Sequence, residues 1–323
     1  MCKVLITTVP FGDKDRSPLD KLEENKISYL INPLGKKLTE DELCTLVGDC
    51  EIIVAGTEPI TDKVMSMAKK LKMISRVGIG LDSVDLLAAE KRGIAVSYTP
   101  DAPAPAVAEL TIGLMYSLLR HTHESNIQLH HGTWHRFFGK RLVNCTIGII
   151  GMGRIGMMTC KHLKALGVSK ILCNDVDEKP IKGVEYVGKD EIYKKSDIIS
   201  LHVPLTAQTK NMITKVEIDS MKRDVYLINT ARGGIINEAD LSNALEDCKI
   251  AGAAIDVFEN EPYNGDLTNY DTCILTSHMG SMSIDCRTKM EIEATDEAVR
   301  FILGGLQDGA VPEEEYEVQR EGL

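Results

Sequence analysis

Short apolar runs alternate with amphipathic segments along the first hundred residues of the chain. The apolar runs are rich in β-branched residues, which predicts strands, and the segments between them have the spacing of helices. The expected strands are residues 3–8, 27–31, 51–55, 72–77 and 94–97, and the expected helices are residues 18–25, 39–47, 61–70 and 84–92. This order is typical of a small doubly wound α/β domain.

A second series of elements begins after a boundary marked by Pro100, Pro103 and Pro105. A long apolar helix is expected at residues 106–120, directly after these prolines. Apolar strands are then expected at residues 146–150, 170–174, 198–201, 225–228, 253–255 and 273–277. Because 323 residues exceed one ordinary core, the two series predict two doubly wound parallel-sheet domains.

The strand at residues 146–150 runs into the glycine-rich turn Gly151-Met152-Gly153-Arg154-Ile155-Gly156, and a helix is expected at residues 157–166. Between a strand and a helix this spacing indicates a dinucleotide site. Gly151 makes the tight turn, Gly153 lets a pyrophosphate approach the backbone, and Gly156 lets helix and strand pack closely. The amino terminus of the helix then faces the phosphates.

Asp175 ends the next strand, 19 residues beyond Gly156. A carboxylate at this place accepts hydrogen bonds from the ribose 2′-hydroxyl and repels a 2′-phosphate. Asp177 and Glu178 add to that repulsion, and no arginine follows closely enough to clamp a phosphate. We therefore expect NAD as the cofactor rather than NADP.

Several later strands end on polar or charged residues. His202-Val203-Pro204 follows one strand, Asn229-Thr230-Ala231-Arg232 the next, and Asp256 and His278 the last two. In a parallel sheet the carboxyl ends of the strands lie along the edge that carries the ligand crevice. Asp175, Arg232, Asp256 and His278 are thus expected to converge on a bound dinucleotide.

Arg232, His278 and a glutamate can supply the chemistry that accompanies hydride transfer to or from a nicotinamide. Arg232 can grip a carboxylate in bidentate fashion and polarise a carbonyl. His278 is the natural proton donor near neutral pH, and an adjacent carboxylate favours its imidazolium form. Spacing alone does not decide between Glu261 and Glu259 as that carboxylate. Taken singly, each of these residues also has a structural explanation, such as a surface ion pair.

The turn Val77-Gly78-Ile79-Gly80 follows a strand of the first domain. Such turns bind ligands through free backbone amides, so Val77, Gly78 and Ile79 are expected to contact the substrate. A turn that merely begins a helix is the alternative interpretation.

Residues 121–143 hold five histidines, two of which, His131 and His135, are four residues apart. No glutamate completes an HExxH pattern and no cysteine or acid is spaced with them, so no metal site is predicted. Trp134, with Phe137 and Phe138, predicts an anchor in a contact between subunits. Together with the apolar helix at 106–120, this segment predicts a homodimer.

Composition narrows the partners and the compartment. A net charge of −11 argues against a nucleic-acid partner. No apolar run approaches the ~20 residues of a membrane span, and the amino terminus lacks the apolar core of a signal peptide. Nine cysteines without a CxxC pair fit reduced thiols. We expect a cytoplasmic protein with neither a membrane nor a nucleic-acid partner.

Taken together, the motifs resemble the D-isomer-specific 2-hydroxyacid dehydrogenase family, close to its phosphoglycerate-dehydrogenase-like branch. The resemblance covers nearly the whole chain. Besides the glycine-rich turn it rests on residues 77–85, 99–101, 106–110, 202–206, 229–234, 256–262 and 277–280.

The resemblance implies a Rossmann cofactor domain, residues 99–283, inserted in a flavodoxin-like substrate domain made of residues 1–98 and 284–323. It places the catalytic residues at Arg232, Glu261 and His278, which favours Glu261 over Glu259. The expected substrate-binding residues are Val77, Gly78, Ile79 and Arg232. The expected cofactor-binding residues are Gly151, Gly153, Arg154, Ile155, Gly156, Asp175, His202, Val203, Pro204, Thr209, Thr230, Ala231, Asp256 and Gly280. Trp134 matches a tryptophan that some members lend to the active site of a dimer partner.

The activity implied is NAD-dependent hydride transfer between nicotinamide and a small D-2-hydroxy acid or 2-keto acid. Candidate substrates resemble 3-phosphoglycerate, hydroxypyruvate, glyoxylate or a phosphonate analogue. Phosphoglycerate enzymes of the family typically have an arginine for the substrate phosphate after the third strand, where this chain has Ala55, and the next turn brings an acid, Glu58. The alternative is an NAD(H)-sensing, corepressor-like binding protein on the same fold. A lyase or isomerase that merely uses bound NAD has less support, because nothing supplies a second catalytic centre.

Overall fold

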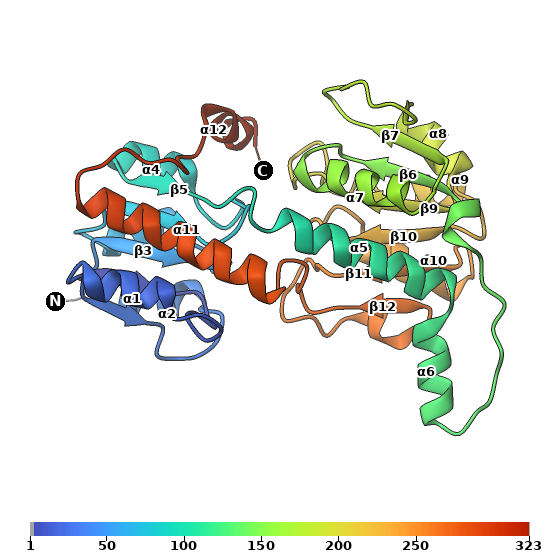
Figure 1. Cartoon of the computed structure of the whole chain (residues 1–323), viewed down its shortest axis with the longest axis horizontal. Coiled ribbons are helices and arrows are strands. Elements are labelled where there is room, and N and C mark those ends of the chain that lie inside the picture. The colour runs from blue at the N-terminus through green and yellow to red at the C-terminus, as the bar shows by residue number, and fades with distance from the viewer. Residues whose placement is uncertain (1–2, 323) are drawn as a thin grey trace. The chain divides into compact units, whose positions relative to one another are not determined.

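The computed structural model describes residues 3–322, which form two compact units (Figure 1). Unit 1 contains the residues up to Pro103 and those from Met282 onward, and unit 2 contains Ala104–Ser281. Each unit has its own parallel sheet, which confirms the expected fold class. The chain passes from unit 1 to unit 2 after Pro103 and returns after Ser281, whereas the sequence-based boundaries are 98/99 and 283/284.

The sheet of unit 1 has the order β2-β1-β3-β4-β5, and all of its neighbouring strands are parallel. It consists of β1 (Val4–Ile6), β2 (Tyr29–Ile31), β3 (Ile52–Ala55), β4 (Met73–Arg76) and β5 (Ala95–Ser97). Successive side chains of a strand point to opposite faces, and both faces of this sheet are covered by helices. This is why its strands are almost continuously apolar.

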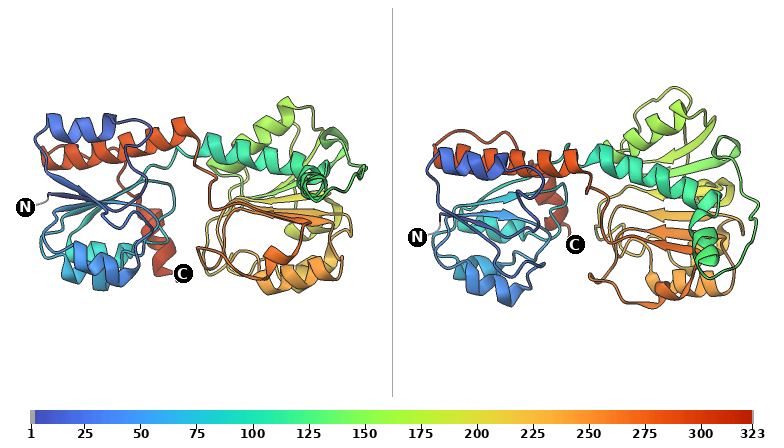
Figure 2. Two further views of the ribbon diagram at one scale, coloured as in Figure 1. Left: turned by 90° about the horizontal axis from the view of Figure 1, so that it is seen from below. Right: turned by 60° about the horizontal axis from the view of Figure 1, so that its bottom comes forward.

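Helices α1 (Ser17–Glu24) and α11 (Ile284–Ile302) cover one face of this sheet (Figure 2, left, blue and orange-red). There Val4, Ile52 and Met73 pack with Met290 and Ala294 of α11. The other face carries α2 (Glu40–Leu46), α3 (Asp62–Met67) and α4 (Leu86–Arg92), and α12 (Glu313–Arg320) packs against α4. Residues from both ends of the chain therefore share one core.

The sheet of unit 2 has the order β12-β11-β10-β9-β6-β7-β8, again all parallel. Its strands are β6 (Thr146–Ile150), β7 (Lys170–Asn174), β8 (Glu185–Tyr186), β9 (Ile198–Leu201), β10 (Tyr226–Asn229), β11 (Gly252–Ile255) and β12 (Cys273–Leu275). One face packs against α5 (Ala104–Leu119) and α7 (Arg154–Ala165), and the other against α8 (Lys189–Lys195), α9 (Lys215–Ser220) and α10 (Glu238–Glu246). Two short 3₁₀ helices, η1 (Leu142–Asn144) and η2 (Asp266–Asn269), complete the unit.

Helix α6 (Thr122–His130) was not expected, and it extends from the end of α5 away from the body of unit 2 (Figure 1). None of its residues is buried. The following segment leaves Trp134 78% and Phe138 99% exposed. His121 bonds to Glu124 and stacks on Phe137. Within residues 3–322, no helix combines the length and the apolar character that a membrane crossing requires.

Candidate active site

Strands β6, β7, β9, β10, β11 and β12 of unit 2 end nearly in register, so the residues that follow them share one edge of the sheet. Asn229 pairs with Ile255 and Ile255 with Leu275, while Ile150 pairs with both Asn174 and Leu201. Arg232, Asp256 and His278 therefore lie at the same edge as the glycine-rich turn and Asp175. This is the edge at which ligands bind to open α/β sheets.

His278 and Glu261 form a pair at this edge. The Nδ1 atom of His278 lies 2.9 Å from Oε1 and 2.9 Å from Oε2 of Glu261. The two side chains are 35% and 21% exposed. Glu259, the other candidate, has an exposed side chain, and its N–H donates to Glu238 Oε1 at 2.7 Å. Of the two glutamates left open by spacing, Glu261 is the one whose carboxylate reaches the imidazole.

The turn that carries His278 is held by Asp256, which is only 1% exposed. One carboxylate oxygen of Asp256 accepts hydrogen bonds from Thr276 Oγ1 at 2.6 Å and Met279 N at 2.9 Å, and the other accepts from Gly280 N at 2.9 Å. The φ of His278 is +49°, a left-handed conformation that costs energy for a residue other than glycine. Asp256 and Gly280 thus fix the position of His278, and their contact with a cofactor stays a prediction.

Arg232 is positioned by a turn built around the buried amide of Asn229. The Asn229 side chain donates to Arg232 O at 2.8 Å and accepts from Ala231 N at 3.0 Å. Thr230 is buried, and its hydroxyl bonds to Thr111 of α5 at 2.9 Å. The half-buried guanidinium of Arg232 donates to Ala231 O at 2.6 Å. The supporting role of Asn229 was not expected, because its two partners are reached only when the turn closes.

The glycine-rich turn has the geometry that a dinucleotide requires. Gly151 has a φ of +95°, and a Cβ on Gly156 would lie 2.0 Å from Gly151 O, so neither position admits a side chain. Nothing lies within 4 Å of the place where Gly153 would carry a Cβ, which leaves room for a pyrophosphate. Helix α7 begins at Arg154, three residues before the expected start, with Gly153 as its N-cap. The amides of Arg154 and Ile155 are thus in its first turn, where anions bind.

Asp175 lies beside this turn, at the end of β7. One of its carboxylate oxygens accepts a hydrogen bond from Met152 N, and the other accepts from Asp177 N at 3.0 Å. The carboxylate therefore ties the end of β7 to the glycine-rich turn. Each oxygen keeps a second lone pair, so acceptance of a ribose hydroxyl fits this arrangement.

His202 follows β9 and packs under the glycine-rich turn, where a Cβ on Gly151 would lie 2.5 Å from His202 O. Its Nε2 bonds to Ser200 Oγ at 2.9 Å, and its buried Nδ1 has no hydrogen-bond partner in residues 3–322. Burial lowers the pKa of His202 to about 4. Val203, Pro204 and Thr209 are also expected to bind the cofactor. Val203 and Pro204 lead into a turn in which the Thr209 hydroxyl donates to Pro204 O at 2.6 Å.

Two of the three backbone amides in the expected substrate turn of unit 1, Val77 to Ile79, are hydrogen-bonded, whereas free amides were expected. Gly78 N donates to Thr99 Oγ1 at 2.8 Å, and Val77 N donates to Ala55 O at 2.8 Å. Within residues 3–322, the amide of Ile79 has no such bond. Thr99 lies 21 residues away, so spacing within the turn could not reveal this partner.

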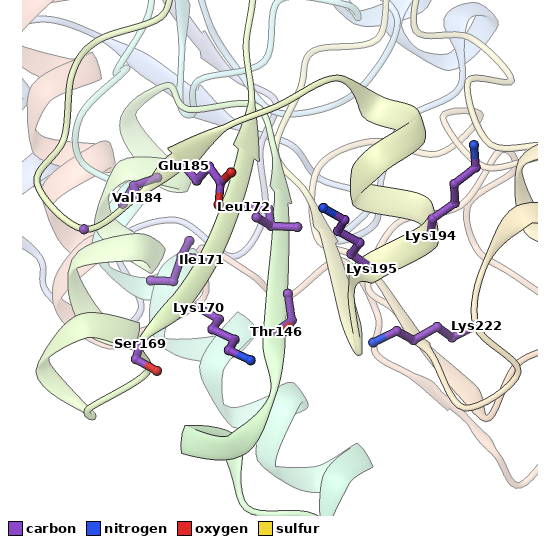
Figure 3. A pocket seen from close by; sticks show the side chains of 11 residues that line it. Thr146, Ser169, Lys170, Ile171, Leu172, Val184, Glu185, Lys194, Lys195 and Lys222 are labelled. Atoms are coloured by element: carbon purple, nitrogen blue, oxygen red, sulfur yellow. The ribbon is translucent and has the colours of Figure 1, made fainter.

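A pocket of about 660 Å³ opens at the opposite edge of the unit 2 sheet (Figure 3). It is lined by the first residues of β6 and β7, Thr146 and Lys170, and by the lysines Lys194, Lys195 and Lys222. It lies at the amino ends of the strands and contains none of the residues expected to bind cofactor or substrate. In the described part of the chain, no three His, Cys, Asp or Glu side chains are grouped so that they could hold a metal ion.

Comparison with known proteins agrees with this geometry. Residues 112–280 match the model of the D-isomer specific 2-hydroxyacid dehydrogenase, NAD binding domain. The chain is 35% identical over 289 residues to a hydroxypyruvate reductase from Thermotoga maritima, which covers 86% of this chain and 94% of that protein. It is 36% identical over 324 residues to a D-3-phosphoglycerate dehydrogenase from Methanocaldococcus jannaschii, covering 96% of this chain but 59% of that longer protein.

A solved structure supports the same relationship. The D-lactate dehydrogenase from Aquifex aeolicus, complexed with NAD and lactic acid, matches with a TM-score of 0.84 and 27% identity. The match covers 96% of this chain and 99% of that one.

Proposed function

The chain belongs to the D-isomer-specific 2-hydroxyacid dehydrogenase family, and we propose that it reduces a small 2-keto acid with NADH through a proton relay of His278 and Glu261. It is accordingly an NAD-dependent 2-hydroxyacid dehydrogenase that uses a nicotinamide cofactor. The observation that carries the relay is the contact of His278 Nδ1 with both carboxylate oxygens of Glu261.

Each residue of the site has a distinct task in this proposal. The nicotinamide, when bound, supplies or accepts the hydride. Arg232 binds the substrate carboxylate and polarises the keto oxygen. Because Glu261 engages Nδ1 of His278, Nε2 is the atom that donates a proton to the substrate oxygen. Glu261 stabilises the imidazolium before the transfer and keeps the ring oriented.

The preference for NAD over NADP rests on Asp175. Its carboxylate is fixed by two backbone N–H groups beside the glycine-rich turn. A 2′-phosphate placed near this anion would be repelled, whereas a 2′-hydroxyl can donate to it. Asp177 and Glu178 follow directly and have the same sign of charge.

We also propose a homodimer, with α5, α6 and the segment up to Val143 in the contact. The support is the exposure of Trp134 and Phe138 on a segment that otherwise packs little. Large aromatic side chains of this kind are typical anchors of protein interfaces.

The test is NADH oxidation at 340 nm with a panel of 2-keto acids that includes glyoxylate and hydroxypyruvate. We expect turnover of at least one of them. His278→Gln should lower turnover roughly 10²- to 10⁴-fold in both directions while NADH binding is nearly unchanged. Tight NADH binding without turnover of any panel member would favour the NAD(H)-sensing alternative.

A further inference from the structure

The pocket at the amino ends of β6 and β7 is positively charged, although the chain as a whole is acidic. Four lysines and one acid, Glu185, are among its lining residues. Over the whole chain, 48 Asp and Glu residues outnumber 37 Lys and Arg residues, which gives a net charge of −11. Like charges that line one concavity repel each other and draw counter-ions into it. This cluster is therefore a candidate site for an anion.

Three segments of unit 2 bring the lysines of this pocket together. Lys170 is the first residue of β7, and Lys194 and Lys195 lie in the last turn of α8. Lys222 follows α9. Side chains alternate between the two faces of a strand, so Lys170 lies on the same face as Leu172, which packs with residues of α8. The side chains of Lys170, Lys195 and Lys222 extend toward the pocket (Figure 3). That of Lys194 points away from it.

Local ion pairs account for only part of this positive charge. Lys222 pairs with Asp197 at 2.9 Å, and Lys195 pairs with Glu191, one turn earlier in α8. The side chains of Lys195 and Glu191 are 62% and 39% exposed, and exposed pairs of this kind are weak, so Lys195 is available to a ligand. The dipole of α8 favours lysines in its last turn. Neither effect explains Lys170, which begins a strand and forms no ion pair within residues 3–322.

The size and the floor of the pocket indicate an organic ligand rather than a bare ion. The volume of about 660 Å³ lies within the range of roughly 300–1,000 Å³ that is typical of small-molecule sites. Apolar side chains, Ile171, Leu172 and Val184, line it as well as the lysines. The two residues of β8 pair with Leu172 and Cys173, so the start of β7 is an open edge of the sheet. A ligand can therefore place an apolar part on this floor.

The polar side chains of the pocket favour phosphate over carboxylate. In the described part of the chain, the cations that line it are all lysines. The planar guanidinium of arginine matches a carboxylate in bidentate fashion, whereas the ammonium group of lysine binds phosphate as a point charge. Thr146 and Ser169 add hydroxyl groups to the lining. Ammonium and hydroxyl groups from several segments can share the oxygen atoms of one phosphorylated ligand.

From these observations we propose that the pocket binds a small organic phosphate with at least two negative charges, held by Lys170, Lys195 and Lys222. The site is separate from the cofactor site, because Thr146 and Gly151 lie at opposite ends of β6. Five residue steps of a strand span about 16 Å at roughly 3.3 Å per residue. The phosphate ligand therefore binds together with NADH and does not compete with it. This site goes beyond the proposed function and does not depend on it.

The experiment titrates the full-length protein, saturated with NADH, with fructose 1,6-bisphosphate in a calorimeter. Saturation with NADH blocks the glycine-rich turn, and this probe has no adenine that could compete there. We expect one saturable site per chain. Lys170→Gln combined with Lys195→Gln should weaken the binding of the probe by at least about tenfold, the scale of two exposed charges at close range. Lys161→Gln combined with Lys189→Gln removes the same charge from α7 and from the first turn of α8, outside the pocket, and should leave the dissociation constant unchanged.

Two further probes test the chemical class of the ligand. Inorganic pyrophosphate carries the charge without an organic part, and citrate carries a similar charge on carboxylates alone. Fructose 1,6-bisphosphate should bind more tightly than either. Citrate that binds as tightly as the bisphosphate overturns the preference for phosphate, and pyrophosphate that binds while the bisphosphate does not overturns the organic class.

The remaining outcomes decide whether the pocket is the site. Absence of saturable binding of all three probes by the parent overturns the inference. So does equal binding of the bisphosphate by the parent and by the Lys170→Gln and Lys195→Gln double variant. The affinity of this variant for NADH should equal that of the parent, which shows that unit 2 is folded. Should the double variant lose NADH, each single variant is titrated instead, and unchanged binding of the bisphosphate in both overturns the inference.

Discussion

The Nδ1 atom of His278 lies 2.9 Å from each carboxylate oxygen of Glu261, although the residues are 17 positions apart in the chain. Reduction of a keto acid needs His278 charged and oxidation of the hydroxy acid needs it neutral, so the two directions should depend oppositely on pH. Glu261→Gln removes the anion that favours the imidazolium. The reductive kcat of this variant should therefore lie below that of the parent across pH 5–9.

Glu259→Gln is the matched control for this measurement. Its side chain is exposed, and its backbone N–H donates to Glu238. The pH profile of this variant should superimpose on that of the parent. If instead Glu261→Gln superimposes on the parent and Glu259→Gln does not, the assignment of the relay is wrong.

Asp175→Ser should weaken the binding of NAD and reduce the preference of the enzyme for NAD over NADP. The substitution removes the negative charge near the ribose, and serine keeps an oxygen that can accept from Met152 N. We expect the ratio of kcat/KM for NADPH to that for NADH to rise about tenfold. Asp177→Ser should raise this ratio less than Asp175→Ser does, because the Asp177 carboxylate is already paired with Lys179 at 3.1 Å. Equal efficiency of NADH and NADPH in the parent would contradict the role of Asp175.

Burial of His202 should make the stability of the protein depend on pH. Its pKa is lowered from 6.5 to about 4, so the unfolded chain binds a proton at pH 5 that the folded protein does not. The folded state is therefore favoured above pH 6.5 and loses this advantage as the pH falls toward 4, by about 2 kcal/mol at pH 5. His202→Gln should lose less stability between pH 7 and pH 5 in urea unfolding. An identical loss in both proteins would show that the imidazole is not responsible.

The proposed homodimer can be examined by light scattering at micromolar concentration. Trp134→Ala combined with Phe138→Ala removes two exposed aromatic side chains and should shift the dimer toward monomer, by at least tenfold in the dissociation constant. At a concentration at which the parent has dissociated, the double variant should unfold at nearly the same urea concentration as the parent, because neither side chain is buried within a single chain. A monomeric parent would contradict this proposal.

The strands of unit 2 could be predicted closely from the sequence, but several helices could not. The bounds of β6, β7 and β9 agree with those expected, because each is a short apolar run with a turn on either side. Helix α6 buries nothing and has no apolar stripe, so periodicity gives no sign of it. The helices α8 to α10 and the strand β8 were not expected either. They are short, and β8 has only two residues.

The candidate site could likewise be predicted only in part from the sequence. Arg232, Asp256 and His278 could be predicted to share an edge, because the ends of parallel strands do so. Their supports could not be predicted, because Asn229 and Asp256 bond to partners that only the closed turns bring near. The same holds for Thr99, whose hydroxyl oxygen accepts a hydrogen bond from Gly78 N. It also holds for Thr7, whose hydroxyl donates to the Glu58 carboxylate although the two residues are 51 positions apart. Long-range hydrogen bonds of this kind leave no pattern in a single sequence.

The division of unit 1 between the two ends of the chain has a consequence for biosynthesis. Helix α11 covers Val4, Ile52 and Met73, yet it is made only after all of Ala104–Ser281 has been translated. At about 5–20 residues per second, synthesis of this stretch takes on the order of ten seconds or more. The face of the unit 1 sheet that α11 covers stays exposed for that time. A nascent chain that already contains most of unit 2 therefore still exposes an apolar face of the unit 1 sheet. Chaperones that hold such surfaces should therefore bind the newly made protein through its first hundred residues.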